Sequence, residues 1–382
     1  MSEAGRAPAL PSTSDCIVLG AGLIGLSTAL HLRWRGLSVR VLERDRVGDG
    51  TSTRASGWIS ASLRTPNALL ELVVASLGYY PELIAQLDDP CGHTTCGTLV
   101  LFDSEEQIAQ RRLLDAEQRK VTSYGGASFI DAREVHARIP AVAPSIIGGA
   151  WCPDDAEIDP QRLVAALHRA TSAAGVSVLQ GAEARTVEKD GAGWRVTTPI
   201  GSFTADKLVN AAGAWSPAVA GLAGLELEVI PVAGQLLVSA RQETLSGPCL
   251  IHQPDPRFAT GLACGIRPAP DGRLWMGTTY RPGTFDSTIT EEDSRAILEA
   301  VKGVIPALRG IQVEQAWAGV RPVPADLLPI YGRVAAAGEY YVAVPVAGLA
   351  ETAIAGRAMA ELIATGRSTT SLDAYSPGRF NR

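Results

Sequence analysis

The sequence has little basic charge. Its 382 residues include 34 lysines and arginines against 40 aspartates and glutamates, which gives a formal net charge of −6 at pH 7. No cluster of basic residues and no low-complexity segment occurs in the chain. Nucleic acids and anionic membrane surfaces are bound by concentrated positive charge. We therefore expect neither nucleic acid nor a membrane among the partners of this protein.

The sequence also lacks a Cys-x-x-Cys pair. Its six cysteines are scattered, and only Cys91 and Cys96 lie near one another, with His93 between them. Zinc sites are usually built from four ligands at regular spacings, so we expect no metal site. The cysteines are interpreted as reduced and mostly buried, as is usual in the cytosol.

The apolar run nearest the N-terminus is too short to cross a membrane. Residues 17–30 contain three glycines, and a membrane helix needs about twenty apolar residues. This run is interpreted as a strand followed by a buried helix. The preceding residues, 1–14, are polar and lack the charged-then-apolar layout of a signal peptide. We expect a soluble, cytoplasmic protein, and its length suffices for two hydrophobic cores.

A strand–glycine–helix pattern fills the first forty-five residues. Residues 16–19 form an apolar run typical of a strand buried on both faces of a parallel sheet. Gly20-Ala21-Gly22-Leu23-Ile24-Gly25 follows directly, then a helical pattern over residues 26–35 and a second strand over 37–42 that ends on Glu43. The glycine motif alone is weak evidence, but the complete βαβ pattern with its terminal acid is strong.

Each part of this unit suits a dinucleotide. Gly20 permits a tight turn, Gly22 lets a pyrophosphate approach the backbone, and Gly25 lets the helix pack closely on the strand. The helix N-terminus offers free N–H groups and the positive end of its dipole to phosphate. Glu43 can accept hydrogen bonds from ribose hydroxyls. The pattern predicts a dinucleotide cofactor but leaves FAD and NAD open.

Further blocks, taken in order, resemble the family of D-amino-acid oxidase, glycine oxidase and sarcosine oxidase, and glycine oxidases in particular. They are Thr51-Ser52-Thr53-Arg54-Ala55-Ser56-Gly57-Trp58-Ile59, Leu208-Val209-Asn210-Ala211-Ala212-Gly213-Ala214-Trp215-Ser216, and Trp317-Ala318-Gly319-Val320-Arg321-Pro322 followed by Gly332-Arg333. The resemblance covers nearly the whole chain. It implies FAD, held without a covalent bond because no cysteine lies in residues 340–350.

The resemblance implies a cofactor site spread over all of these blocks. The residues carried over are Gly20, Gly22, Leu23, Ile24, Gly25, Glu43, Arg44, Ser52, Thr53, Arg54, Ala55, Ser56, Gly57, Trp58, Val187, Ala212, Gly213, Trp215, Val346, Ala347, Gly348 and Leu349. Val187 matches the position whose backbone meets the adenine. The helix that begins near Gly348 would point its N-terminus at the flavin, where reduction builds negative charge.

Three residues are predicted to be catalytic. Trp58 and Ile59 fall where family members place side chains beside the flavin ring, although core packing alone would also explain Trp58. Arg321 matches the family arginine that binds the substrate carboxylate, and a planar guanidinium suits that task because it makes two parallel hydrogen bonds. The alternative for Arg321 is a structural arginine at a domain junction.

The implied fold is α/β, a Rossmann-like FAD-binding domain with a second α+β substrate domain built on an antiparallel sheet. The FAD-binding domain would use residues 1–80, 147–218 and 322–382, and the substrate domain 81–146 and 219–321. Several patterns agree with this division: a β-meander over 185–205, a helix from Asp159-Pro160, substrate-sheet strands at 234–239, 263–266 and 274–277, and a strand at 340–344 that leads into a helix ending at Gly366.

The substrate pocket departs from the glycine oxidase pattern. Val344, Val346 and Ala347 replace a histidine, an arginine and an asparagine, and Gly265 replaces a tyrosine. A second carboxylate arginine is therefore missing from its family position. Arg267, Arg273 and Tyr280 are the candidates for residues that compensate for this loss. The replacements by Gly265 and Val346 predict a roomier, more apolar pocket and a substrate larger than glycine.

The resemblance implies oxidation of the C–N bond of an amino acid or secondary amine, with hydride transfer to flavin N5 and, with O2, release of hydrogen peroxide. One alternative keeps the flavin but passes electrons to a quinone or a partner subunit. Another is a flavin-binding subunit without turnover. A nicotinamide dehydrogenase is disfavoured because residues 54–59 have no role in that chemistry. Whether the chain forms a homo-oligomer is left open.

Overall fold

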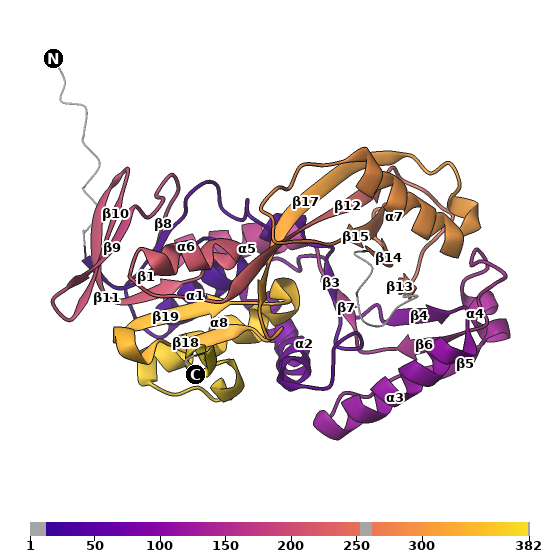
Figure 1. Ribbon diagram of the computed structural model, residues 1–382, viewed down its shortest axis with the longest axis horizontal. Coiled ribbons are helices and arrows are strands. Elements are labelled where there is room, and N and C mark those ends of the chain that lie inside the picture. Colours follow the sequence, from indigo (N-terminus) through magenta and orange to yellow (C-terminus); the bar gives the residue numbers. More distant parts are fainter. Residues whose placement is uncertain (1–12, 253–261, 381–382) are drawn as a thin grey trace, which may run out of the picture.

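The computed structural model describes residues 13–252 and 262–380. The first twelve residues of the polar N-terminal segment therefore lie outside the described part. The described chain forms two lobes, each built on its own large sheet, with the chain crossing several times between them (Figure 1).

The first sheet is mainly parallel. Its strand order is β18-β19-β11-β1-β2-β8, and β10 and β9 extend it from β11. The strands are β1 (Thr13–Leu19), β2 (Val39–Leu42), β8 (Ser177–Leu179), β9 (Thr186–Asp190), β10 (Gly193–Thr198), β11 (Gly201–Asn210), β18 (Ile330–Arg333) and β19 (Tyr340–Val344). The pairs that β1 forms with β2 and β11, and β11 with β19, are parallel. This is the dinucleotide-binding architecture that the βαβ pattern predicts.

Both faces of this sheet are covered, which explains the continuous apolar run of β1. Successive side chains of a strand point to opposite faces. Val18 accordingly joins the core under the helices, whereas Ile17 joins the core on the opposite face with Trp194 and Tyr340. The predicted β-meander is present as β9, β10 and β11, and its third strand continues into the centre of the sheet.

The second sheet is antiparallel except for one parallel pair. Its order is β16-β12-β15-β14-β13-β4-β6-β5, and β17 pairs with β12. The strands are β4 (Thr98–Phe102), β5 (Ser128–Asp131), β6 (Gly148–Cys152), β12 (Val229–Ser239), β13 (Cys249–His252), β14 (Leu262–Pro268), β15 (Leu274–Thr279), β16 (Arg281–Pro282) and β17 (Val313–Pro324). The parallel pair is β4 with β13. Two short strands, β3 (Trp58–Ile59) and β7 (Ala156–Glu157), form a separate ribbon.

Eight α-helices cover these sheets in the described chain. They are α1 (Leu23–Trp34), α2 (Ala68–Gln86), α3 (Glu105–Val121), α4 (Ala132–Arg138), α5 (Pro160–Ala173), α6 (Ser216–Gly221), α7 (Glu291–Val304) and α8 (Gly348–Thr365). The predicted ends are confirmed for two of them. The Asp159 side chain accepts hydrogen bonds from the backbone of Gln161 and Arg162 at the start of α5, and α8 ends on Gly366 in the left-handed conformation.

One strand differs from the predicted domain division. The predicted FAD-binding domain includes residues 147–218, yet β6 lies in the second sheet. It forms five-residue and four-residue antiparallel ladders with β4 and β5, and these backbone hydrogen bonds hold it there. The segment thus crosses to the first lobe only after Cys152.

By length and composition alone, helix α2 could cross a membrane, and 44 % of its most apolar 18-residue stretch is buried inside the protein. Its side chains Leu70, Val73 and Leu83 join the core that contains α1 and α8. Such packing is that of a core helix. All six cysteines are free, and five of them are buried, as the sequence predicts.

Candidate active site

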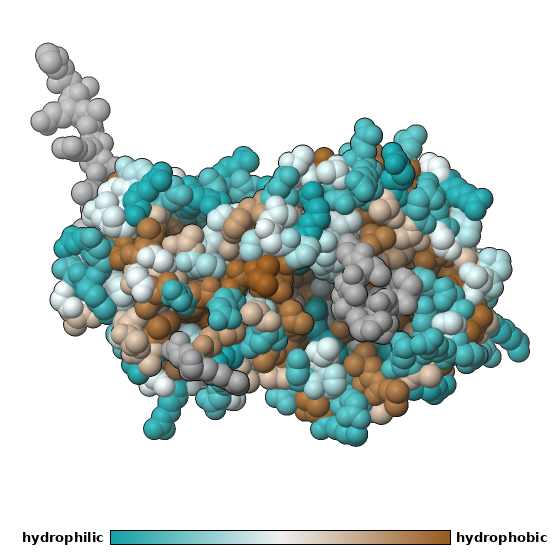
Figure 2. Space-filling model, viewed as in Figure 1, coloured by the Kyte–Doolittle hydropathy of each residue, from teal (hydrophilic) through white to brown (hydrophobic). Residues whose placement is uncertain are grey.

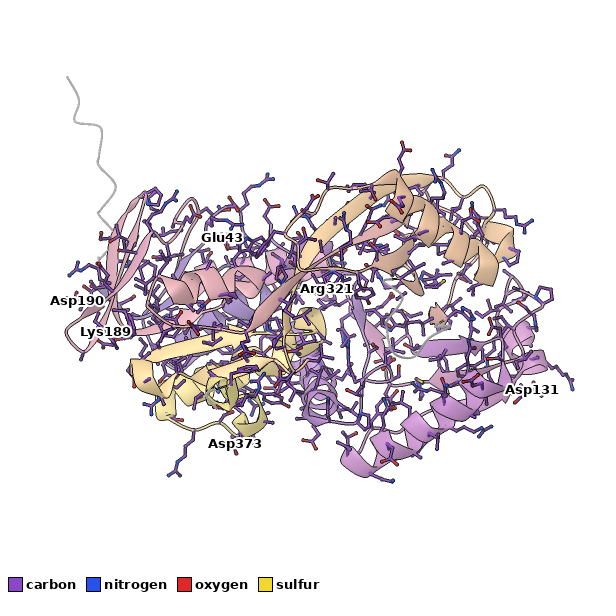
Figure 3. All side chains as sticks on the ribbon, viewed as in Figure 1. Glu43, Asp131, Lys189, Asp190, Arg321 and Asp373 are labelled. Carbon is purple, nitrogen blue, oxygen red and sulfur yellow. The ribbon has the colours of Figure 1, made fainter. Side chains whose placement is uncertain are left out.

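A cavity of about 1040 Å³ lies between the two sheets. It runs from the carboxyl ends of β1 and β2 to the face of the second sheet that carries Leu236 and Gly265. Figure 3 shows Glu43 on the lobe of the first sheet and Arg321 where the two lobes meet. On the face seen in Figure 2, apolar surface gathers over this junction. Ligands of open α/β sheets bind at the carboxyl ends of parallel strands, so the cavity lies where a nucleotide is expected.

Two glycines set the shape of the nucleotide end. Gly20 has φ +108°, and a Cβ there would lie 2.6 Å from the Ala211 carbonyl oxygen. A Cβ on Gly25 would lie 2.0 Å from the Gly20 carbonyl oxygen, because α1 packs directly on the loop. The cap residue of α1 is Gly22, which has no side chain that could accept hydrogen bonds from the N–H groups at the start of this helix. The loop therefore offers backbone donors in a cradle too tight for side chains, which fits a pyrophosphate.

Glu43 lines this end and also organises it. One carboxylate oxygen accepts a hydrogen bond from the Ala21 N–H at 2.7 Å, and the other accepts one from the Asp45 N–H at 2.9 Å. Each oxygen keeps lone pairs for further donors. The sequence predicts the acid at the end of β2, but its hydrogen bond to the glycine loop is visible only in the structure.

The predicted segment after β2 lies along the middle of the cavity. The Ser52 hydroxyl accepts a hydrogen bond from the Leu23 N–H at 3.0 Å, and the Thr51 hydroxyl donates to the Val320 carbonyl at 2.5 Å. Arg54 donates to the Gly50 carbonyl at 2.6 Å and to Asp49 at 3.1 Å. This segment therefore ties α1 of the first lobe to β17 of the second.

Most of the predicted cofactor residues line this single cavity. They are Gly20, Gly22, Leu23, Ile24, Glu43, Arg44, Ser52, Arg54, Ala55, Ser56, Trp58, Ala212, Gly213, Trp215, Val346, Ala347, Gly348 and Leu349. Residues that the sequence places more than 300 positions apart are thus brought together.

Five predicted residues lie outside the cavity wall: Gly25, Thr53, Gly57, Ile59 and Val187. Ile59 is fully buried, and Val187 belongs to the core between β9 and β10. Residues 182–184, which follow β8, line the cavity instead of Val187. These residues belong to the segment between β8 and β9, so the chain meets the cavity a few residues before Val187.

The start of α8 is organised by Glu351, a residue that the sequence reasoning missed. Its fully buried carboxylate accepts hydrogen bonds from the N–H groups of Val346, at 3.0 Å, and Ala347. It also accepts one from the Tyr331 hydroxyl at 2.5 Å, and burial raises the pKa of this carboxyl. A Glu in the first turn of a helix is the signal that would have found it.

Arg321 projects from β17 into the other end of the cavity. Its Nη2 donates to the Thr278 hydroxyl at 3.1 Å, and its guanidinium lies 4.8 Å from the centre of the Tyr280 ring. Its Nη1 is buried and has no hydrogen-bond partner among the described residues. A buried donor normally has a partner, so this atom favours a ligand that can accept hydrogen bonds.

Trp58 fills the space opposite Gly265. A Cβ on Gly265 would lie 3.2 Å from Cζ3 of Trp58, and the indole N–H donates to the Thr98 hydroxyl at 2.9 Å. The room that the sequence analysis predicted at Gly265 is therefore taken up by the indole. The physical reason is that β3 carries Trp58 across to β14, a contact that sequence spacing does not reveal.

The three candidates for replacing the missing carboxylate arginine lie in different surroundings. Arg267 lines the cavity but is paired with Glu157 at 3.1 Å, and Arg273 is held outside it by Asp271 and Glu314. Tyr280 lines the cavity beside Arg321.

A further arginine, Arg64, faces the cavity from a position that the sequence does not predict. Arg64 lines it and donates through Nε to the Ser60 carbonyl at 3.1 Å. Burial lowers the pKa of its guanidinium, and the charges of Glu351 and Tyr280 act in the opposite direction. No sequence pattern points to Arg64, because it lies in an irregular segment between β3 and α2.

Comparisons with known proteins agree with this geometry. A family model described as FAD dependent oxidoreductase matches residues 15–362. Glycine oxidase from Bacillus licheniformis is 28 % identical over 84 % of this chain and 84 % of its own length. The bifunctional protein ThiO/ThiG from Synechocystis sp. is 29 % identical over 97 % of this chain, which spans 55 % of that longer protein. The crystal structure of glycine oxidase from Geobacillus kaustophilus has a TM-score of 0.90 at 24 % identity, with 96 % of this chain and 99 % of that chain covered.

The family model spans most of the chain, and the glycine cradle between β1 and α1 fits the pyrophosphate of the cofactor that this family uses. The same arrangement of strands and helices is found in the glycine oxidase structure. This protein therefore belongs to the FAD-dependent oxidoreductase family, and FAD is its cofactor.

Proposed function

We propose that this protein oxidises the C–N bond of an amino acid or N-substituted amino acid that is anchored by its carboxylate on Arg321. Non-covalently bound FAD would accept the hydride from the substrate α-carbon. The observation that carries the proposal is the buried, unpartnered Nη1 of Arg321 in the wall of the cavity that also contains the glycine loop. The names of the similar glycine oxidases support an amino acid as substrate.

The side chains of this chain would bind and orient the substrate. Arg321 supplies the planar donor pair, and the hydrogen bond from its Nη2 to Thr278 fixes the direction of the guanidinium. Trp58 closes one side of the pocket through its contact with Gly265. Arg64 adds a further positive charge to the same cavity. A carboxylate is thereby favoured over a neutral group, because opposite charges attract strongly where water is excluded.

The walls of this end favour an apolar substituent. Leu236, Ile251, Met276 and Val346 line the cavity. An apolar wall rewards each added methylene by about 0.8 kcal/mol. We therefore retain the prediction of a substrate larger than glycine, now based on Val346 and these side chains rather than on space at Gly265.

Rapid mixing under anaerobic conditions tests the proposal, with bleaching of the flavin band as the signal. Each amino acid, including glycine, sarcosine, proline and bulkier examples, is compared with the amine that lacks its carboxylate. We expect the carboxylate form to reduce the flavin faster than its matched amine, and proline or a bulky amino acid to exceed glycine. Equal rates for acid and amine would contradict anchoring on Arg321, and fastest reduction by glycine would contradict the apolar pocket.

The electron acceptor is a separate part of the proposal. We propose O2 as acceptor, with hydrogen peroxide as product, and a quinone or a partner subunit as the alternative. Oxygen consumption during turnover, compared with reduction of an artificial dye, separates the two. Flavin that no substrate reduces would instead favour a flavin-binding subunit without turnover.

We further propose the predicted two-domain division, with β6 assigned to the substrate domain. The separation of the two large sheets and their separate apolar cores support it. The free thiols suit the reducing cytoplasm that we propose as its location.

A further inference from the structure

Two cysteines that are far apart in the sequence meet in the second lobe. The sulfur atoms of Cys96 and Cys249 lie 3.8 Å apart. Their backbones are held by the only parallel strand pair of the described second sheet, in which Cys249 is paired with Thr98 and its N–H donates to the Gly97 carbonyl at 3.2 Å. The two thiols are therefore positioned by the sheet, and 153 positions separate them in the chain.

The two thiols differ in exposure and in acidity. Cys96 is partly exposed, whereas Cys249 is 1 % exposed. A hydrogen bond from the Cys249 thiol lowers the pKa of Cys96, and burial raises the pKa of Cys249. Because the thiolate is the reactive form, Cys96 is the nucleophile of the pair and Cys249 is the thiol beside it.

We propose that Cys96 and Cys249 form an oxidation site at which a peroxide produces an intramolecular disulfide. The Cys96 sulfur attacks one peroxide oxygen, the O–O bond breaks, and the other oxygen leaves as water after taking a proton. The Cys249 sulfur then attacks the sulfur of the Cys96 sulfenic acid, the S–O bond breaks, and the hydroxyl leaves as a second water with the Cys249 proton. Overall, two thiols lose two electrons and one peroxide becomes two waters.

The two sulfur atoms need to move only a short distance to form a disulfide bond. A disulfide bond is about 2.05 Å long, so the sulfur atoms must approach by roughly 1.8 Å. We expect rotation of the two side chains to supply this approach, because side chains move between rotamers more readily than a strand pair moves its backbone. The oxidant is of the class that the proposed reaction with O2 would itself release near these strands, since Ile251 of β13 lines the cavity.

A metal ion is the less favoured occupant. Among the described residues, a Glu157 carboxylate oxygen and these two sulfur atoms lie within 4.8 Å of one another. However, Glu157 is paired with Arg267 at 3.1 Å, and both side chains are at least 94 % buried. A cation would have to share its carboxylate ligand with a buried guanidinium, and no fourth ligand joins the cluster from the described residues.

Peptide mapping of the peroxide-treated protein tests the proposal without requiring turnover. The full-length, FAD-loaded protein is reduced, freed of reductant and treated with hydrogen peroxide, and it is then denatured and alkylated so that the buried thiols also react. We expect the number of alkylated cysteines to fall from six to four. A peptide pair joined through Cys96 and Cys249 should appear, and dithiothreitol should restore both thiols.

Two variants make the experiment specific. In Cys249→Ala, peroxide should oxidise Cys96 beyond the sulfenic acid to the sulfinic acid, because no neighbouring thiol remains to react with the sulfenic acid. In the control Cys264→Ala, which removes a buried cysteine of β14, the Cys96–Cys249 disulfide should still form. Free thiols at both positions after treatment, a disulfide between two chains, or retention of added Zn²⁺ with protection from peroxide would each overturn the proposal.

Discussion

The two ends of the cavity are built in different ways. The glycine cradle of the nucleotide end is formed mainly by backbone atoms of six consecutive residues, Gly20 to Gly25. The substrate end is shaped by side chains that come from distant segments, among them Trp58, Arg64 and Arg321. A backbone surface leaves a fixed spacing in the sequence, whereas a side-chain surface depends on how strands and loops meet. The backbone surface is therefore recognisable from the sequence and sensitive to any added atom. The side-chain surface can change its shape and charge by substitution of single residues.

The largest effect is expected from adding one methyl group to the nucleotide end. In Gly25→Ala the new Cβ would lie 2.0 Å from the Gly20 carbonyl oxygen, so α1 must move away from the loop. We expect loss of FAD during purification. The matched control is Gly78→Ala, another helical glycine, where a Cβ would meet nothing within 4 Å. The absorbance ratio of flavin to protein measures the difference, and a fully yellow Gly25→Ala protein would contradict the role of the cradle.

At the substrate end, Arg321→Met should lower kcat/KM by about a hundredfold, which is about 2.7 kcal/mol, because a carboxylate loses a charge-assisted pair of hydrogen bonds. Arg321→Lys should retain part of the activity, since a point charge remains without the planar fork. FAD content should stay normal in both variants.

Arg333→Met removes an exposed arginine of β18 and serves as the control. Steady-state kinetics on the best substrate provide the measurement. Normal turnover by Arg321→Met with FAD bound would place the carboxylate anchor elsewhere.

A smaller effect is expected at Glu43. Removing its carboxylate in Glu43→Ala deletes an acceptor for the ribose and frees the Ala21 N–H that it holds at 2.7 Å. Hydrogen bonds to charged groups contribute about 1–3 kcal/mol, so FAD affinity should fall by about tenfold while kcat of the FAD-saturated enzyme is retained. Titration of the apoprotein with FAD gives the affinity. An unchanged dissociation constant would show that Glu43 serves neither role.

The smallest effect on the cavity is expected from a substitution of Glu361, which lies in the C-terminal part of α8, away from the cavity. Burial opposes ionisation of Glu361, but hydrogen bonds from Thr369 and Arg357 lower the pKa of its carboxyl to about 2. In the unfolded chain the pKa is near 4.5. The carboxylate therefore stabilises the fold above pH 4.5, and this contribution is lost as the pH falls toward 2.

Glu361→Gln should accordingly lower the free energy of unfolding by about 2 kcal/mol at pH 7, with unchanged FAD affinity and turnover. Denaturation of both proteins at pH 7 and pH 3.5 tests the sign, because the difference should shrink at the lower pH. A difference that grows on acidification would contradict the assigned hydrogen bonds.

Much of the fold was predictable because its signals are local. Asp159 and Gly366 mark helix ends by their own chemistry, and the run before Gly20 marks a strand covered on both faces. The contact of Trp58 with Gly265 was not predictable, since it depends on β3 and β14 meeting across the cavity. Periodicity likewise says nothing about Arg64, which lies outside any helix or strand.

The parallel pairing of β1 has a consequence for synthesis on the ribosome. On one edge Val18 pairs with Val41, which follows closely, but on the other edge it pairs with Val209, about 190 residues later. At about 5–20 residues per second, translation takes roughly 10–40 s to supply that partner. An apolar strand edge stays unpaired meanwhile, which is the kind of surface that invites aggregation. The Gly20 turn, among the first structures translated, can close against Ala211 only after that delay.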